Sequence, residues 1–139
     1  MKVVICDDSI EDLMKIDEAL AKYNERNPGR DIQVEKYSDA LQLYARIKEK
    51  ELADLYILDM IMPEKTGIEL GNKLRQCGSE KGIIYITTSD EFAMDAYDVH
   101  ALRYLLKPLR EDQLFEALDY AFSYSDVSNG ARYLVRTRT

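Results

Sequence analysis

Five short, mostly apolar runs punctuate this chain of 139 residues, and segments with apolar residues at helical spacing lie between them. Alternation of strand-like and helix-like segments predicts an α/β fold with a parallel sheet. The first, third and fourth runs are the most apolar, so they are expected at the sheet centre, which predicts the strand order 2-1-3-4-5. The expected strands cover residues 1–6, 32–36, 54–58, 83–86 and 102–106.

Helix-start signals follow the apolar runs. Ser9 and Ser38 are suitable N-caps, and Thr66 with Glu69 matches a capping box. The fold class predicted is therefore a flavodoxin-like, doubly wound, five-stranded parallel sheet with five helices. Polar residues from Ser123 onward are turn-prone and predict a linker. The expected helices lie near residues 10–27, 39–47, 67–77, 91–98 and from 111 onward.

Composition narrows the classes of function. An apolar fraction of 46% indicates one globular domain, and the net charge of −7 argues against nucleic-acid binding by this chain alone. No apolar run approaches the ~18 residues of a membrane span, and the early first strand leaves no room for a signal peptide, so a cytoplasmic location is expected. Cys6 and Cys77 have no metal-ligand spacing, and His100 is the only histidine, which disfavours histidine metal sites and a Ser-His-Asp triad.

Candidate chemistry lies where the strands end. Asp7 and Asp8 follow the first strand, Asp59 the third, Thr87 the fourth and Lys107 the fifth. In a doubly wound sheet these positions face one crevice beyond the carboxyl ends of the strands. Clustered carboxylates need a neutralising cation, and all-oxygen ligation suits Mg²⁺. A hydroxyl and an ammonium beside them suit a phosphoryl group.

Taken in order, these motifs resemble the receiver domain of two-component response regulators. The matching stretches are Asp7-Asp8, Asp59-Met60-Ile61-Met62-Pro63 with Gly67, Thr87, and Tyr104-Leu105-Leu106-Lys107-Pro108. Phe92-Ala93 and the stretch from Ala101 to Pro108 are similar to receivers attached to LytTR-type DNA-binding domains. Residues 1–125 are accordingly expected to be the receiver. Residues 126–139, with a basic end, are expected to be a linker and the start of an effector domain that is missing here.

The resemblance implies a role for each strand-end residue. Asp59 is the expected phosphoacceptor for a sensor histidine kinase, and Lys107 is expected to pair with the phosphoryl group or with Asp59. Thr87 is expected to bind a phosphoryl oxygen; the alternative is that it only satisfies a strand-end amide. Tyr104 is expected to move inward as Thr87 shifts, or else simply to pack on its sheet. The expected Mg²⁺ ligands are Asp7 through water, Asp8, Asp59 and the main-chain carbonyl of Ile61.

The output expected of such a switch is a phosphorylation-favoured homodimer through the fourth helix, fifth strand and fifth helix. It is expected to control transcription, contacting DNA only through the missing effector domain and needing no membrane. The chain is not expected to be an enzyme beyond its own phosphorylation and slow dephosphorylation. The expected dimer surface comprises Phe92, Met94, Asp95, Tyr97, Asp98 and Arg103.

Three other classes use related architecture. A Mg²⁺-dependent phosphatase with an aspartyl-phosphate intermediate needs a second acid two residues after a strand-one nucleophile, where Ser9 stands. A flavodoxin-like flavin protein needs a phosphate-cradling loop, whereas Asp7 and Asp8 repel phosphate. A pseudo-receiver binding partners without phosphorylation would not need the complete acid set.

Overall fold

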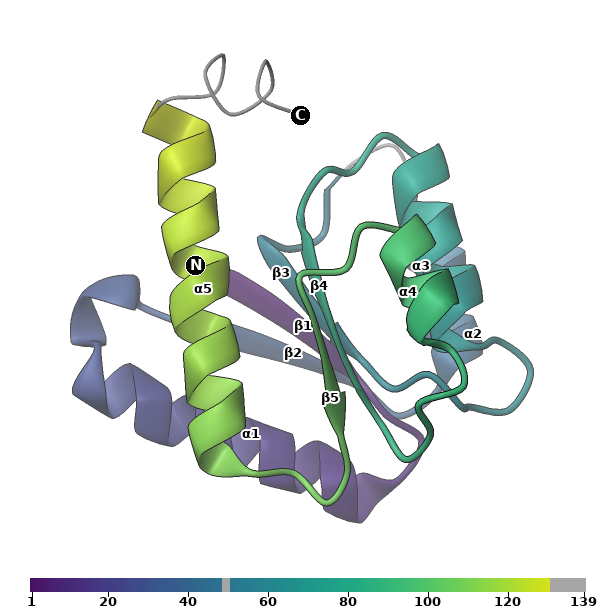
Figure 1. The fold of residues 1–139 in the computed structure, drawn as a ribbon, viewed down its shortest axis with the longest axis horizontal. Helices are drawn as coiled ribbons and strands as arrows, with labels where there is room; N and C mark the ends of the chain where they lie inside the picture. The colour runs from purple at the N-terminus through teal and green to yellow at the C-terminus, as the bar shows by residue number, and fades with distance from the viewer. Residues whose placement is uncertain (49–50, 131–139) are drawn as a thin grey trace.

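The computed structural model describes residues 1–48 and 51–130, with residues 124–130 described by their backbone alone. A five-stranded parallel sheet in the order β2-β1-β3-β4-β5 forms the centre of the molecule, which confirms the predicted topology (Figure 1). The strands are β1 (Lys2–Cys6), β2 (Gln33–Tyr37), β3 (Leu55–Leu58), β4 (Gly82–Thr87) and β5 (Arg103–Leu106).

Helices cover both faces of the sheet, with α1 and α5 on one side and α2, α3 and α4 on the other (Figure 1). Successive residues of a strand point to opposite faces, so β1 sends Val3 and Ile5 to the core under α1 and α5, and Val4 and Cys6 to the other core. The helices are α1 (Ile10–Arg26), α2 (Ala40–Arg46), α3 (Gly67–Gln76), α4 (Ala93–Asp98) and α5 (Glu111–Gly130), with a short 3₁₀ turn at Pro28–Arg30.

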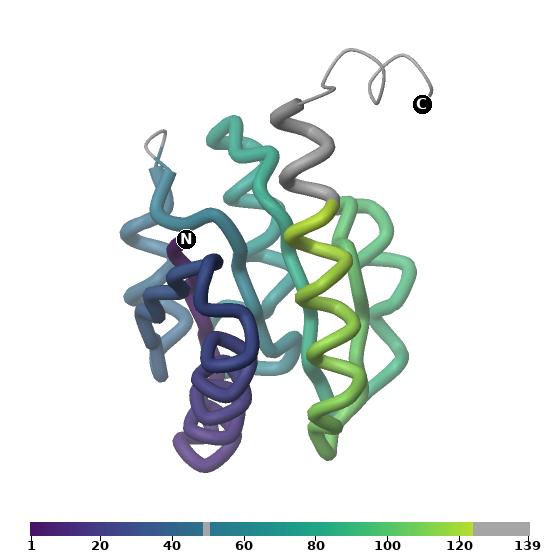
Figure 2. Tube along the Cα trace, turned by 90° about the vertical axis from the view of Figure 1, so that its left-hand side faces the viewer, coloured from purple at the N-terminus to yellow at the C-terminus, as the bar shows by residue number. Residues whose placement is uncertain are grey.

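The α1 and α5 helices lie side by side on their face of the sheet (Figure 2). Tyr23 joins them: its hydroxyl donates to Asp119 at 2.7 Å, and its ring meets Phe115 edge-on at 5.5 Å. Burying a tyrosine ring while satisfying its hydroxyl stabilises such a contact. This packing holds the C-terminal part of α1 against α5.

Helix boundaries mostly follow the capping signals. Ser9 accepts from the Asp12 amide, and Thr66 and Glu69 form the predicted capping box. The predicted cap of α2 is wrong by one residue, because Asp39 and not Ser38 accepts from the Leu41 amide. The turn-like backbone predicted from Ser123 onward is also wrong, because α5 continues as a helix to Gly130.

Two further expectations concern the chain's ends and the bilayer. The strand-like fragment expected after Gly130 lies outside the described residues. Among the residues that are described, no helix combines the length and the apolar character needed to cross a membrane.

Candidate functional site

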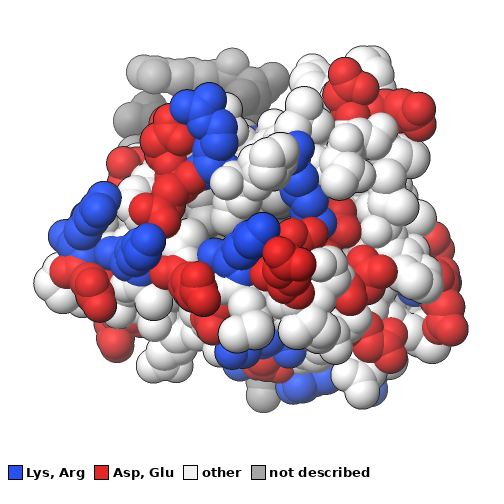
Figure 3. All heavy atoms as spheres, turned by 90° about the horizontal axis from the view of Figure 1, so that it is seen from below, with Lys and Arg blue, Asp and Glu red and all other residues white. Residues whose placement is uncertain are grey.

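Three carboxylates meet at the carboxyl ends of β1 and β3. Asp7, Asp8 and Asp59 each offer an oxygen, and these oxygens lie within 4.8 Å of one another. Asp7 is fully buried and Asp59 is 6% exposed, whereas Asp8 is open to solvent. Figure 3, which views the molecule from below, shows acidic and basic side chains crowded at this end. The structure therefore brings together the three acids that were predicted from their positions at the strand ends.

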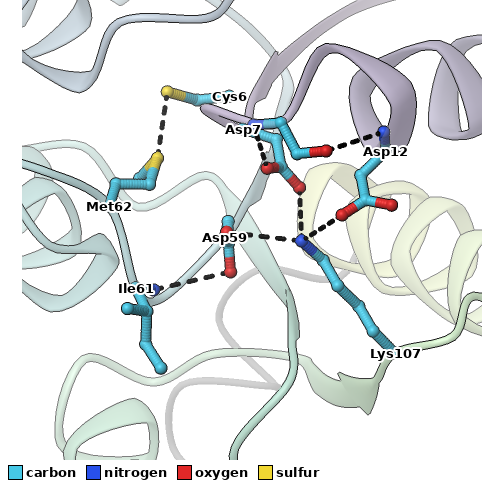
Figure 4. Close-up of polar contacts among 8 residues, drawn as sticks. Cys6, Asp7, Asp12, Asp59, Ile61, Met62 and Lys107 are labelled. Atoms are coloured by element: carbon cyan, nitrogen blue, oxygen red, sulfur yellow. Dashed lines mark hydrogen bonds and ion pairs between the residues drawn. The ribbon is translucent and has the colours of Figure 1, made fainter.

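Lys107 lies among the acids and bridges them. Its ammonium donates to Asp7 at 2.8 Å, to Asp12 at 2.9 Å and to Asp59 at 3.3 Å (Figure 4). The backbone turns into this position directly after β5, through a cis peptide bond between Lys107 and Pro108. The expected pairing of Lys107 with Asp59 is present, and Lys107 also holds two other carboxylates.

Asp12 belongs to this site, although its sequence position suggested only a helix start. It is the residue of α1 whose amide is capped by Ser9, so its side chain lies in the first helical turn beside the crevice. The hydrogen bond from Lys107 is the main cause that lowers the pKa of Asp12. The sequence signal for including Asp12 in the site was that it is an acid in the first turn of the helix that follows Asp7-Asp8.

The electrostatics of the cluster favour an added cation. Burial, and then the charge of Asp7, raise the pKa of Asp59, while Lys107 acts in the opposite direction. Burial alone would lower the pKa of Lys107, but hydrogen bonds to Asp7 and Asp12 and the charge of Asp59 outweigh it and raise that pKa. One ammonium therefore faces more negative charge than it can neutralise. This oxygen-only donor set fits Mg²⁺.

Thr87 ends β4 with a buried hydroxyl. Its main-chain carbonyl accepts from the Lys107 amide at 2.7 Å, but its side-chain oxygen has no hydrogen-bond partner anywhere in the described part of the chain. Buried polar atoms almost always have a partner. The strand-end amide therefore does not use this hydroxyl, which remains able to bind an oxygen of a ligand.

Tyr104 lies on β5 with its ring turned toward the protein. Its hydroxyl donates to the main-chain carbonyl of Ser89, in the loop after β4, and its ring centroid is 6.4 Å from that of Tyr85. Tyr85 is fully buried, and its hydroxyl donates to the carbonyl of Gly67 at 2.8 Å. Sequence reasoning missed Tyr85, for which the signal was a tyrosine inside a buried strand, since its hydroxyl requires a partner.

Ile61 and Cys6 border the acids. The Ile61 amide donates to Asp59 at 3.4 Å, while the Ile61 side chain is 48% exposed at the rim. Cys6 is buried and its thiol contacts the Met62 sulfur at 3.7 Å (Figure 4). Burial, and then the charge of Asp7, raise the pKa of Cys6 to about 12, so this thiol stays protonated.

The residues expected at the dimer surface differ in availability. Met94 and Tyr97 are 74% and 75% exposed on α4, and Asp95 and Asp98 are also exposed. Phe92 is half-buried and packs against the core beneath α4. Arg103 is bound within its own chain, where it donates to both carboxylate oxygens of Glu116.

The structure is an α/β protein with a doubly wound sheet, and carboxylates, a lysine and a hydroxyl without a hydrogen-bond partner among the described residues lie together beyond its strand ends. Groups of this kind are able to bind a cation and a phosphoryl group. The family model described as the response regulator receiver domain matches residues 3–119. The chain belongs to this family of two-component, phosphorylation-based signalling domains.

Individual relatives are consistent with the LytTR branch. The chain is 32% identical over 69 residues to the sensory transduction protein LytT of Bacillus anthracis, covering 50% of this chain and 28% of that protein. It is 26% identical over 141 residues to the transcriptional regulatory protein NatR of Bacillus subtilis, covering 100% of this chain and 58% of NatR. The chain thus spans only part of the length of these relatives.

The fold is also that of solved receiver structures. The response regulatory domain of protein mrkE from Klebsiella pneumoniae superimposes with a TM-score of 0.75 at 23% identity. That comparison covers 89% of this chain and 97% of the solved one. It supports the architecture described above.

Proposed function

We propose that Asp59 accepts a phosphoryl group from a sensor histidine kinase, and that the resulting charge change alters the surface formed by α4, β5 and α5. The observation that carries this proposal is the set of three carboxylate oxygens within 4.8 Å of one another, with Lys107 bridging Asp7 and Asp59. Such a cluster at the strand ends is costly unless a ligand uses it.

Each residue has a definite part in the transfer. An oxygen of Asp59 attacks phosphorus as the bond from phosphorus to the donor nitrogen breaks, and the imidazole leaves with that electron pair. Lys107 neutralises a phosphoryl oxygen, and the unpartnered hydroxyl of Thr87 donates to another. Preorganised donors of this kind stabilise the charge on the transferring group.

Mg²⁺ is the cofactor that this site would hold, through Asp8, Asp59, the Ile61 carbonyl and, by way of water, Asp7. When bound, Mg²⁺ neutralises phosphoryl oxygens and so permits a carboxylate to attack phosphorus. Asp8 is the exposed member of the acid cluster, which suits it to receive a hydrated ion. Replacing Asp8 with alanine should weaken Mg²⁺ binding in isothermal titration calorimetry.

The surface change follows from the position of Thr87. Drawing the Thr87 hydroxyl toward a phosphoryl oxygen moves the end of β4 and the loop containing Ser89, which accepts from the Tyr104 hydroxyl. Because of this hydrogen bond, movement of the loop changes the position of Tyr104 and with it the surface of β5 and α4. Phosphorylation then favours a homodimer, and a transcriptional output follows through an effector domain that contacts DNA.

Intact mass spectrometry after incubation with acetyl phosphate and Mg²⁺ tests the phosphoacceptor. The protein should gain one phosphoryl group, and Asp59→Asn should gain none. Asp31→Asn is a matched control, because Asp31 adopts a left-handed backbone that asparagine tolerates. A phosphoryl adduct on Asp59→Asn would contradict the assignment. Absence of the adduct from Asp31→Asn, with the adduct still present on Asp59→Asn, would do so as well.

A further inference from the structure

The outward surface of α4, β5 and α5, called here the α4–β5–α5 face, exposes large apolar side chains. Met94 and Tyr97 on α4 are 74% and 75% exposed, Leu106 on β5 is 47% exposed and Tyr120 on α5 is 40% exposed. Exposed apolar groups gathered on neighbouring elements are typical of a protein-binding surface. Figure 1 shows β5 at the edge of the sheet, between α4 and α5.

Charge on this face is divided unequally between the elements. In the segment that forms α4 and its preceding turn, every charged side chain is acidic. None of these acids forms an ion pair with any residue that the structure describes. The cations lie on β5 and at the start of α5, and acids of α5 already hold them: Arg103 pairs with Glu116, and Arg110 with Asp112. The unpaired acids are Asp90, Glu91, Asp95 and Asp98.

Arg103 donates one part-buried hydrogen bond to the Leu102 carbonyl at 2.9 Å, and its other contacts, with Glu116 and Tyr120, lie at the surface. Its guanidinium donates to the two Glu116 oxygens at 3.2 and 2.9 Å, and it lies 3.9 Å from the centroid of the Tyr120 ring. The side chains of Arg103 and Glu116 are 32% and 59% exposed. Exposed ion pairs contribute little to stability, so an acid presented by another molecule can compete for this arginine.

We propose that Glu116 is an internal competitor of self-association, and that dimer formation transfers Arg103 from Glu116 to Asp95 or Asp98 of a second copy of this chain. The inference rests on the proposed function, because it concerns the same face. It adds a physical reason for weak self-association of the unmodified protein: the cation required at the interface is already paired with Glu116.

A second copy fits this face because it supplies both missing components. In a two-fold symmetric interface, α4 of each copy lies against β5 and α5 of the other, so one arginine–acid contact is made twice. Met94 and Tyr97 then cover apolar surface at the centre, with the charges around them. If Arg103 stayed with Glu116, the acids of α4 would meet a surface without a free cation, which disfavours docking.

Sedimentation equilibrium of the wild type and the variants named below, each without phosphodonor and with beryllofluoride and Mg²⁺, tests the exchange. Glu116→Gln keeps the shape of the side chain but removes the charge that pairs with Arg103, and should lower the dimer dissociation constant about fivefold, the scale of one exposed ion pair. Adding Arg103→Gln to Glu116→Gln should remove that gain. Glu91→Gln removes an unpaired acid from the same face and should change the constant by less than about twofold.

Three results would overturn the inference. The first is a dimer dissociation constant in Glu116→Gln equal to that of the wild type, and the second is an undiminished gain in affinity when Arg103→Gln is added. The third is an equal gain in affinity from Glu91→Gln, which would show an effect of net charge alone. Replacing both Asp95 and Asp98 with asparagine should also abolish the gain from Glu116→Gln. The comparison without phosphodonor does not depend on Asp59. Failure of phosphorylation would therefore contradict the proposed function, while an unchanged dimer constant in Glu116→Gln would contradict only this inference.

Discussion

Gly67 permits the close approach that positions the phosphoacceptor loop. It is the first residue of α3, and its amide donates to the Met60 carbonyl at 2.9 Å. A Cβ added at Gly67 would lie 2.4 Å from the main-chain oxygen of Asp59, 2.9 Å from Cα of Met60 and 2.9 Å from Cε1 of Tyr85. Replacing Gly67 with alanine should therefore strain the segment that carries Asp59.

The size of the effect follows from which atoms must move. The contact with the Asp59 oxygen falls about 1 Å inside the 3.4 Å at which ordinary contact begins, and backbone cannot rotate away as a flexible side chain can. Overpacking costs about 1–3 kcal/mol, and we expect the upper end because the third contact is with a buried ring. Alanine favours helix over glycine by about 1 kcal/mol, so the net loss of unfolding free energy should be about 2 kcal/mol.

Urea denaturation of Gly67→Ala and Gly29→Ala measures this loss against a matched control. A Cβ at Gly29 meets nothing within 4 Å, so Gly29→Ala should be neutral or slightly stabilising. Gly67→Ala should also bind beryllofluoride more weakly, because Asp59 is displaced. Equal stability and equal beryllofluoride affinity in the two variants would refute the steric reasoning.

Three other predictions concern the acid site and its border. Because the pKa of Asp59 is raised in the folded protein, the ionised carboxylate of Asp59 opposes folding at pH 7. Asp59→Asn should therefore raise the urea midpoint at pH 7 without Mg²⁺. This gain should vanish below the ordinary carboxyl pKa of about 3.9, where Asp59 is protonated in the folded and the unfolded protein. Ile61→Asn should shorten the lifetime of the phosphoryl group several-fold, which corresponds to about 1 kcal/mol in the hydrolysis barrier. The asparagine side-chain amide can orient the attacking water, whereas isoleucine cannot. Equal phosphate-release rates in the two proteins would contradict this role of Ile61. In a thiol-reagent assay, half-buried Cys77 should react in the folded protein and Cys6 only after unfolding; rapid reaction of two thiols would contradict the burial of Cys6.

Much of the fold could be predicted because apolar pattern and burial are closely linked in a parallel sheet. The runs that form β1, β3 and β4 are apolar on both sides since helices cover both faces, and this places them at the centre of the sheet. Local capping was less certain, because Ser38 and Asp39 are adjacent and both can cap. Ser, Asp and Asn residues beyond Ser123 weaken a helix without excluding it, which explains the wrong turn prediction there.

The strand-end residues of the site could be predicted because topology alone brings them together. Asp12, Tyr85 and Glu116 could not be identified in that way, since their roles depend on side-chain partners from other elements. Asp12 meets Lys107 across 95 positions of sequence, and Glu116 meets Arg103 from the next helix. Side-chain reach and rotamer choice decide such contacts, and periodicity contains neither.

The distance along the chain between Asp7 and Lys107 has a consequence for how the protein acquires its activity. These residues are 100 positions apart, and β1 and β5 are separated in the sheet by β3 and β4. A chain emerging from the ribosome exposes its acids long before the lysine that offsets them, and long-range parallel pairing is slow to form. The complete crevice therefore arises only when the last strand docks, so a nascent, truncated or locally unfolded chain lacks it.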